Sequence, residues 1–81
     1  MLIKDVMQYL KAADDALEDK NYDNALDILN DALKYYKNSP RIYLMLAEVR
    51  ERLAISATDD VKRQEHIEEA FEAYNKAAEL I

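Results

Sequence analysis

His66 and Glu69 are the residues of this chain whose types and spacing come closest to those of a chemical site. A His-x-x-Glu spacing on a helix places both side chains on one face, where an imidazole and a carboxylate can ligate a metal ion. Dimetal helical bundles instead use Glu-x-x-His in pairs, and here Arg63 precedes the histidine by three residues. His66 is the only histidine, the sequence has no cysteine, and Ser39 and Ser56 fall near predicted helix ends. We therefore expect no catalytic residue, no metal ligand and no cofactor, and interpret His66-x-x-Glu69 as part of a solvated acidic face.

Three aspartates, Asp23, Asp27 and Asp31, recur at a spacing of four residues. A calcium loop needs glycine and closely spaced acidic residues in a non-helical turn, and the chain has no glycine. Residues spaced by four lie along one face of a helix. The sequence therefore predicts a solvent-facing row of charges here, and no calcium site.

The composition indicates one small helical domain without affinity for nucleic acid. The chain has 81 residues, of which 51% are hydrophobic and 35% charged, with one proline. Its net charge of −6 is divided equally between residues 1–40 and 41–81, so neither half offers the basic patch that binds phosphate backbones. No apolar run approaches the ~18 residues of a membrane-spanning helix, and the first ten residues do not resemble a signal peptide. We expect a soluble, cytoplasmic protein with a single domain over residues 1–81, no membrane partner and no small-molecule substrate.

Apolar residues recur at helical spacing in four successive segments, which predicts an all-α fold of four helices. The apolar stripes are Ile3, Val6, Leu10, Ala13 and Leu17; Tyr22, Ala25, Leu26, Leu29, Ala32, Leu33 and Tyr36; Ile42, Leu46, Val49, Leu53 and Ala57; and Ile67, Ala70, Phe71, Tyr74, Ala77 and Ile81. Because the intervening loops are short, neighbouring helices are expected to pack antiparallel. The predicted hairpins cover residues 2–36 and 40–81.

Helix-start signals separate these segments. Asn21 is the predicted N-cap of the second helix. Ser39 followed by Pro40 is typical of an N-cap and a first helical turn, and residues 58–60 (Thr-Asp-Asp) are expected to begin the fourth helix.

The tyrosines divide into two groups. Five fall on or beside the apolar stripes and are expected in the core: Tyr9, Tyr22, Tyr36, Tyr43 and Tyr74. Tyr35 lies off the stripe, and we expect it to be exposed, where an aromatic side chain can anchor a protein partner.

The helical segments contain an internal repeat. Tyr9-x2-Ala12-Ala13 aligns with Tyr43-x2-Leu46-Ala47 at an offset of 34 residues, and Ala25-x3-Leu29-x2-Ala32 aligns with Ala70-x3-Tyr74-x2-Ala77 at an offset of 45. Thirty-four residues is the period of tetratricopeptide repeats, which carry aromatic and alanine positions of this kind. The chain resembles this family, with two degenerate copies covering nearly its whole length. The resemblance implies two stacked helical hairpins, a short α-solenoid in which the small residues mark close helix crossings.

The sequence departs from the family pattern at several positions. Lys37 stands where the closing proline is usual, and Arg50 replaces a core aromatic residue. Lys20 replaces a turn glycine, and Asn21 is the expected substitute for it. The second copy contains 11 additional residues, so its hairpin is expected to be longer and to overhang the first through residues 53–67.

The resemblance also implies a groove, lined by the first helix of each repeat, that takes extended peptides or helices. The matching positions are Met7, Leu10, Asp14, Leu17, Glu18, Arg41, Leu44, Glu48, Glu51 and Arg52. Family members that clamp a C-terminal carboxylate carry Lys and Asn at four of these positions, where this chain has leucine or an acid, so that ligand is not expected. An apolar floor centred on Leu10, Leu17 and Leu44 with an acidic rim favours a helical or extended segment that is apolar or basic.

Other interpretations remain open at this stage. A closed four-helix bundle, or a three-helix module of the MIT type, would also satisfy much of the helical pattern. In function, the leading hypothesis is a non-catalytic protein-interaction module. The alternatives are a structural homodimer that buries the groove or the C-terminal edge, with added contacts from Val61 and Ile67, and an engineered or excised repeat scaffold without native activity.

Overall fold

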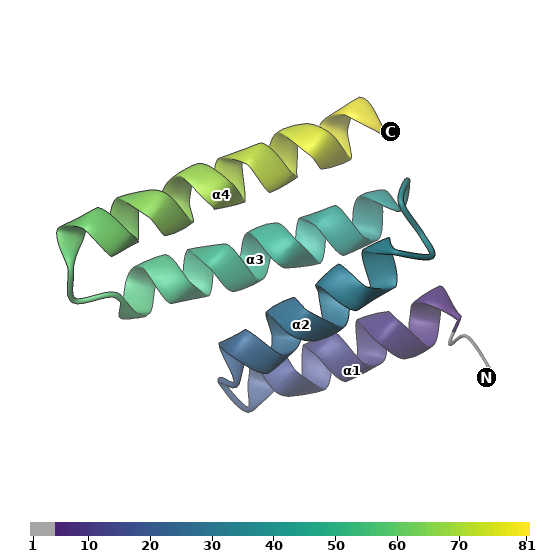
Figure 1. Cartoon of the computed structure of the whole chain (residues 1–81), viewed down its shortest axis with the longest axis horizontal. Helices are drawn as coiled ribbons and strands as arrows, with labels where there is room; N and C mark the ends of the chain where they lie inside the picture. Colours follow the sequence, from purple (N-terminus) through teal and green to yellow (C-terminus); the bar gives the residue numbers. More distant parts are fainter. Residues whose placement is uncertain (1–4) are drawn as a thin grey trace.

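The computed structural model describes residues 5–81, and within this range the chain forms four α-helices and no strand. The helices are α1 (Val6–Glu18), α2 (Tyr22–Leu33), α3 (Pro40–Ser56) and α4 (Asp60–Glu79). Consecutive helices run in alternating directions (Figure 1). The all-α prediction is confirmed, while Ile3 of the first predicted stripe lies outside the described residues.

Side chains cap the starts of three helices. Asp5 and Gln8 form a capping box at α1, in which each side chain accepts a hydrogen bond of 2.8 Å from the backbone N–H of the other residue. Asn21 caps α2 as predicted. Asp59 caps α4, within the residues 58–60 that were expected to begin that helix. Ser39 occupies the predicted N-cap position of α3 without a capping hydrogen bond from its side chain.

The turn between α1 and α2 is made by Lys20 in a left-handed conformation. Its φ angle is 61°, a region in which glycine has no steric penalty and other residues do. Asn21, expected to take the role of the missing glycine, has a φ of −92° and serves only as the N-cap. The prediction for Asn21 was wrong in this respect, because the left-handed position lies one residue earlier.

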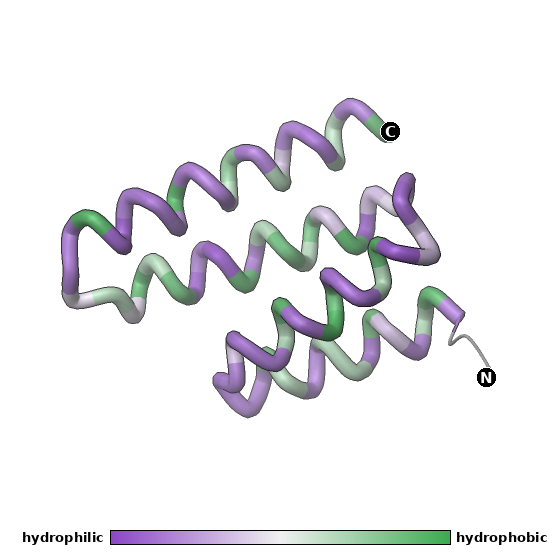
Figure 2. The backbone as a smooth tube through the Cα atoms, in the orientation of Figure 1, coloured by the Kyte–Doolittle hydropathy of each residue, from purple (hydrophilic) through white to green (hydrophobic). Residues whose placement is uncertain are grey.

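The hydrophobic core joins α1, α2 and α3. Leu29, Ile42 and Val49 are its largest fully buried side chains, with Tyr9 and Leu10 packed beside them. Among the described helices, α2 contacts both α1 and α3, whereas α4 contacts α3 alone. Within residues 5–81, α4 contributes no side chain to this core cluster. Figure 2 shows short hydrophobic stretches of α4 separated by hydrophilic ones.

Small residues lie where α4 meets α3. The buried residues of α4 are Ala70 and Ala77, and α3 buries Ala47 and Ala54. Small side chains permit a short distance between helix axes. Burial of Ala70 and Ala77 agrees with the predicted stripe of α4, and the close approach of the helices at the repeated alanines stays a prediction.

The core prediction for α4 was wrong at its large residues. Ile67, Phe71, Tyr74 and Ile81 are exposed by 42%, 66%, 41% and 90%. The reason is that a helix with one neighbour buries a narrow stripe, and here the alanines occupy that stripe. Of the other tyrosines predicted in the core, Tyr9 is buried and Tyr22, Tyr36 and Tyr43 are half-buried.

The second pair of helices is longer than the first, as predicted. α3 and α4 have 17 and 20 residues, against 13 and 12 for α1 and α2. The turn between α3 and α4 lies well beyond the turn between α1 and α2 (Figure 1). Part of α3 and α4 is therefore left without cover from the first two helices.

Candidate functional site

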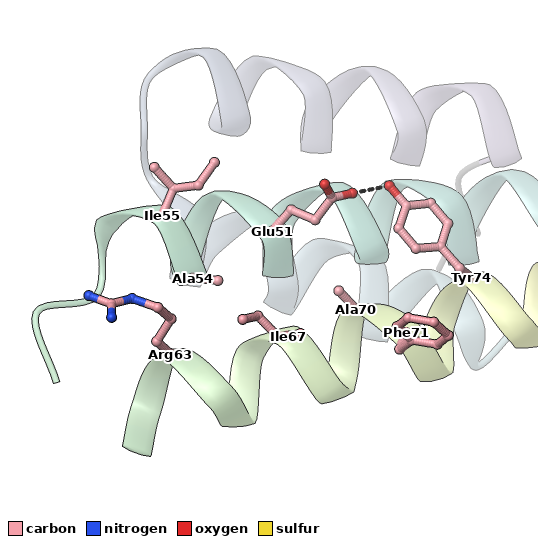
Figure 3. Close-up of a pocket in the computed structure, with 8 residues that line it drawn as sticks. All are labelled: Glu51, Ala54, Ile55, Arg63, Ile67, Ala70, Phe71 and Tyr74. Carbon is pink, nitrogen blue, oxygen red and sulfur yellow. Dashed lines mark hydrogen bonds between the residues drawn. The ribbon is translucent and has the colours of Figure 1, made fainter. Parts of the chain in front are cut away.

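A groove of about 440 Å³ lies between α3 and α4. We call it the α3–α4 groove. Its lining residues are Glu51, Ala54, Ile55, Arg63, Ile67, Ala70, Phe71 and Tyr74. Figure 3 shows the two alanines between the helices, Arg63 toward the α3–α4 turn, and Tyr74 with Phe71 farther along α4.

Large apolar side chains form the walls of this groove. Ile55, Ile67 and Phe71 are exposed by 81%, 42% and 66%, whereas Ala54 and Ala70 at the floor are buried. Single exposed apolar residues are common on protein surfaces, but a contiguous concave group of them is typical of an interaction site. Burying such side chains gains roughly 25 cal/mol per Å² of apolar surface. The groove therefore favours an apolar partner surface.

Tyr74 and Glu51 connect the two helices at one end of the groove. The Tyr74 hydroxyl donates a hydrogen bond to Glu51 Oε1 (Figure 3). This hydrogen bond, followed by partial burial and the negative charges of Glu51 and Glu48, raises the pKa of Tyr74 to about 12. The phenol is thus held in its neutral form at this end of the apolar wall.

Arg63 occupies the other end of the groove. Its Nη1 lies 2.7 Å from Asp60 Oδ1, and its Nη2 donates to the Ala57 carbonyl oxygen over 2.8 Å. These contacts hold the guanidinium against the α3–α4 turn, although 43% of the side chain stays exposed. The α3–α4 groove therefore has a cation at one end and an anion at the other.

A second set of charges lies elsewhere on the α3–α4 pair. Arg50 Nη2 lies 2.6 Å from Glu69 Oε2, and Arg50 Nη1 lies 3.3 Å from His66 Nδ1. His66-x-x-Glu69 was interpreted as a solvated acidic face. Glu69 is exposed, as predicted, whereas His66 is half-buried, and both side chains contact Arg50 across the helix pair. Arg50, at a position where the resembled family has an aromatic residue, links α3 to α4 through polar contacts. Within residues 5–81, no group of three or more His, Asp or Glu side chains is placed to hold a metal ion.

The row of aspartates on α2 is also partly structural. Asp23 and Asp27 are exposed, as predicted. Asp31 is half-buried and accepts a hydrogen bond of 3.2 Å from the Tyr9 hydroxyl, so the prediction of a fully solvated row was wrong at this residue. Burial and this hydrogen bond raise the pKa of Tyr9.

The predicted groove along α1 and α3 is open only in part. Met7, Asp14 and Glu18 of α1 are exposed, as are Arg41, Leu44, Glu48, Glu51 and Arg52 of α3. Leu10 and Leu17 are each 4% exposed and belong to the core cluster. The prediction that these two leucines form the open floor of a groove was therefore wrong, because α2 packs on α1 and buries them in the core.

The structure brings some of the predicted groove residues together and separates others. Arg41 Nη1 approaches Met7 Sδ at 3.8 Å, which joins the starts of α1 and α3. Leu44, Glu48 and Glu51 share one face of α3 with Ile55, at helical spacing. Only Glu51 of the predicted set lines the α3–α4 groove.

Tyr35 is 42% exposed, as predicted. Its ring stacks on Tyr9, with centroids 6.5 Å apart and an interplanar angle of 20°. Tyr35 thus already contacts another ring of the protein and is less exposed than Phe71, at 42% against 66%, which makes it a weaker candidate for a partner anchor.

Sequence reasoning missed the main apolar residues of the groove. Ile67 and Phe71 were assigned to the core, because a helical stripe does not reveal how many neighbours will cover it. One signal was present: Ile55 falls outside the predicted stripe of its helix, and an isoleucine off the core face is an early sign of a second apolar face.

Comparison with known proteins adds no family assignment. The chain matches no protein-family model, no curated protein and no solved structure. Among residues 5–81, no helix combines the length and the apolar character that crossing a membrane requires.

Proposed function

We propose that this chain is a non-catalytic protein-interaction module that binds an amphipathic helix in the α3–α4 groove. The proposal keeps the class of function expected from the sequence and moves the site from the α1–α3 face to α3 and α4. The observation that carries it is the exposed apolar wall formed by Ile55, Ile67 and Phe71. We place the fold, as part of this proposal, among two-repeat tetratricopeptide-like helical proteins.

The internal repeat supports a helix as the ligand. At an offset of 45 residues, Ile67, Phe71 and Tyr74 of α4 correspond to Tyr22, Leu26 and Leu29 of α2. The α2 residues are half-buried or buried in the cluster that joins α1, α2 and α3. By this correspondence, α4 exposes the kind of surface that α2 buries against its neighbouring helices.

Charge around the groove supports a partner with basic residues. Glu48 and Glu51 lie on the α3 side, and the chain carries a net charge of −6. Complementary charges at an interface accelerate association and select among partners. We therefore propose an amphipathic helix with an apolar face flanked by Lys or Arg, a mode of binding in which the anchors recur at i, i+3, i+4 and i+7.

The test is binding of a synthetic Leu/Lys amphipathic peptide that carries a fluorescent label. We expect saturable binding by fluorescence anisotropy, with a peptide of the same apolar pattern but Glu in place of Lys binding at least about tenfold more weakly. Phe71→Lys should abolish binding of the Leu/Lys peptide.

Val61→Lys is the matched control. Val61 is an apolar residue of the same helix with nearly the same exposure, 65%, but it lines a different surface together with Asp60 and Gln64. Equal loss of binding in the two variants would contradict the α3–α4 groove as the site. Equal binding of both peptides would contradict the selection for basic partners.

A further inference from the structure

The α3–α4 groove is self-complementary, and we infer that it pairs with the same groove of a second copy of this chain about a twofold axis. The two α4 helices would lie antiparallel in this dimer. The inference rests on the proposed function in one respect, that the groove binds an amphipathic helix. Because α4 carries six acidic and three basic residues, its apolar face and Arg63, and not a basic flank, would match the groove of the second copy.

The order of groove residues along α4 supports this pairing. Arg63, Ile67, Phe71 and Tyr74 follow one another at helical spacing. An isologous interface requires a surface that matches itself when it is reversed. Reversing α4 about a point near residue 69 sets Ile67 against Phe71 of the second copy, and Arg63 against Tyr74 of the second copy.

The charges of the groove match in the same orientation. Arg63 and Glu51 are the charged residues among those that line it, and the Tyr74 hydrogen bond places Glu51 at the end away from Arg63. Antiparallel pairing brings Arg63 of each copy to the Glu51 end of the other. A guanidinium has five N–H donors, and Arg63 directs Nη1 and Nη2 toward Asp60 and Ala57, which leaves donors for a carboxylate. Parallel pairing would instead set like charges together.

The dimensions of the site predict a weak dimer. α4 has 20 residues and is about 30 Å long, which is enough for the paired stretch. Eight residues line the groove, whereas standard interfaces use roughly 20–30 residues on each side. The net charge of −6 on each copy also opposes association, an effect that salt screens. We therefore expect a dissociation constant on the order of 10 μM at physiological ionic strength.

The experiment is light scattering and sedimentation equilibrium on the full chain at concentrations up to about 1 mM. The expected result is a mass that rises on concentration from the monomer value of 9.4 kDa toward twice that value. Phe71→Lys should raise the dissociation constant at least about tenfold, with an unchanged circular-dichroism spectrum. Val61→Lys should dimerise like the wild type.

Charge reversal tests the antiparallel geometry. Glu51→Arg and Arg63→Glu each set like charges together in a homodimer, so each variant alone should be monomeric where the wild type is dimeric. An equimolar mixture of the two restores both opposite-charge contacts, and we expect it to form heterodimers. A binding partner other than a second copy would produce no such rescue.

Three results would overturn the inference: a monomer at every concentration, an equal effect of Phe71→Lys and Val61→Lys, or no rescue in the mixture. Binding of the labelled Leu/Lys peptide distinguishes failure of the self-pairing inference from failure of the proposed helix-binding function. A monomer that binds the peptide would overturn self-pairing and support the helix-binding function. A monomer that binds no peptide would overturn both.

Discussion

Helices α2 and α4 carry the same pattern of small and large apolar residues, yet the large residues are buried to different extents in the two helices. Their alanines, Ala25 and Ala70, are 0% and 4% exposed. At the large positions the two helices diverge, since Leu29 is fully buried and its counterpart Tyr74 is 41% exposed. The difference follows from the neighbours: α2 lies against α1 and α3, whereas α4, among the described helices, contacts α3 alone.

The comparison teaches that each helix has two separate apolar surfaces. Both helix pairs bury the alanine surface. The surface with large residues is covered in α2, which has two neighbouring helices, and exposed in α4, which among the described helices has one. In α2 that surface belongs to the core, and in α4 it forms the wall of the α3–α4 groove.

Truncating the corresponding large residues should give the largest difference between the two helices. Leu29→Ala leaves a cavity in the core and should lower the free energy of unfolding by about 2–5 kcal/mol. Tyr74→Ala removes an exposed ring and one hydrogen bond, and should cost less than about 1 kcal/mol. Urea unfolding monitored by circular dichroism measures both. Equal losses of unfolding free energy in the two variants would show that Tyr74 is buried as deeply as Leu29, and would contradict the difference between α2 and α4.

Enlarging the corresponding alanines should instead give similar effects. Ala25→Leu and Ala70→Leu each force a larger side chain into a close helix contact, and each should lower the free energy of unfolding by about 1–3 kcal/mol. Ala78→Leu, the same change at an exposed position of α4, should cost nearly nothing. If Ala70→Leu behaved like Ala78→Leu in thermal melts, the alanine contact between α3 and α4 would be refuted.

Raising the pH should have the smallest effect on the free energy of unfolding. It acts on one tyrosine–carboxylate hydrogen bond in each helix pair, which is lost when the tyrosine loses its proton. The Tyr9 hydroxyl donates to Asp31 and the Tyr74 hydroxyl donates to Glu51. The pKa of each phenol is raised above its usual value of 10.0, for Tyr74 to about 12. A raised folded-state pKa gives stability that is complete below the unfolded-state pKa and is lost as pH rises through the folded-state value. Stability should therefore decline from about pH 10 to about pH 12.

Tyr74→Phe sharpens that comparison. The variant should lack the loss of stability at high pH that is caused by deprotonation of Tyr74, and it should keep the loss that is caused by deprotonation of Tyr9. Near-ultraviolet absorbance of the phenolates, followed together with helical circular dichroism, measures both parts. An alkaline decline identical in the variant and the wild type would mean that the Tyr74–Glu51 bond does not contribute.

Much of the fold could be predicted from the chain itself. The helical spacing of apolar residues and the capping residues Asn21 and Asp59 are local signals, because they depend on residues within one or two turns. The added length of the second helix pair was likewise readable from the two repeat offsets, 34 and 45. The left-handed residue was misplaced by one position, since neither Lys20 nor Asn21 is glycine and backbone dihedral angles at a turn depend on both flanking helices.

The candidate site was predicted less well. Glu51 was assigned to a binding surface and lines the α3–α4 groove, but Leu10 and Leu17 were assigned to it and lie in the core. Ile67 and Phe71 were assigned to the core and are exposed. These errors have one cause: helical periodicity identifies an apolar face without identifying the element that covers it.

The sequence by itself determined that residues 5–81 form four helices, where the last three of them begin, and which faces are apolar, since these properties arise from contacts between residues close along the chain. Only the tertiary structure decided which apolar faces are buried. That outcome depends on contacts between residues far apart in the sequence: α2 and α3 cover each other, and α4 keeps its large residues toward solvent. The α3–α4 groove, and with it the proposed binding function, follows from that arrangement in space.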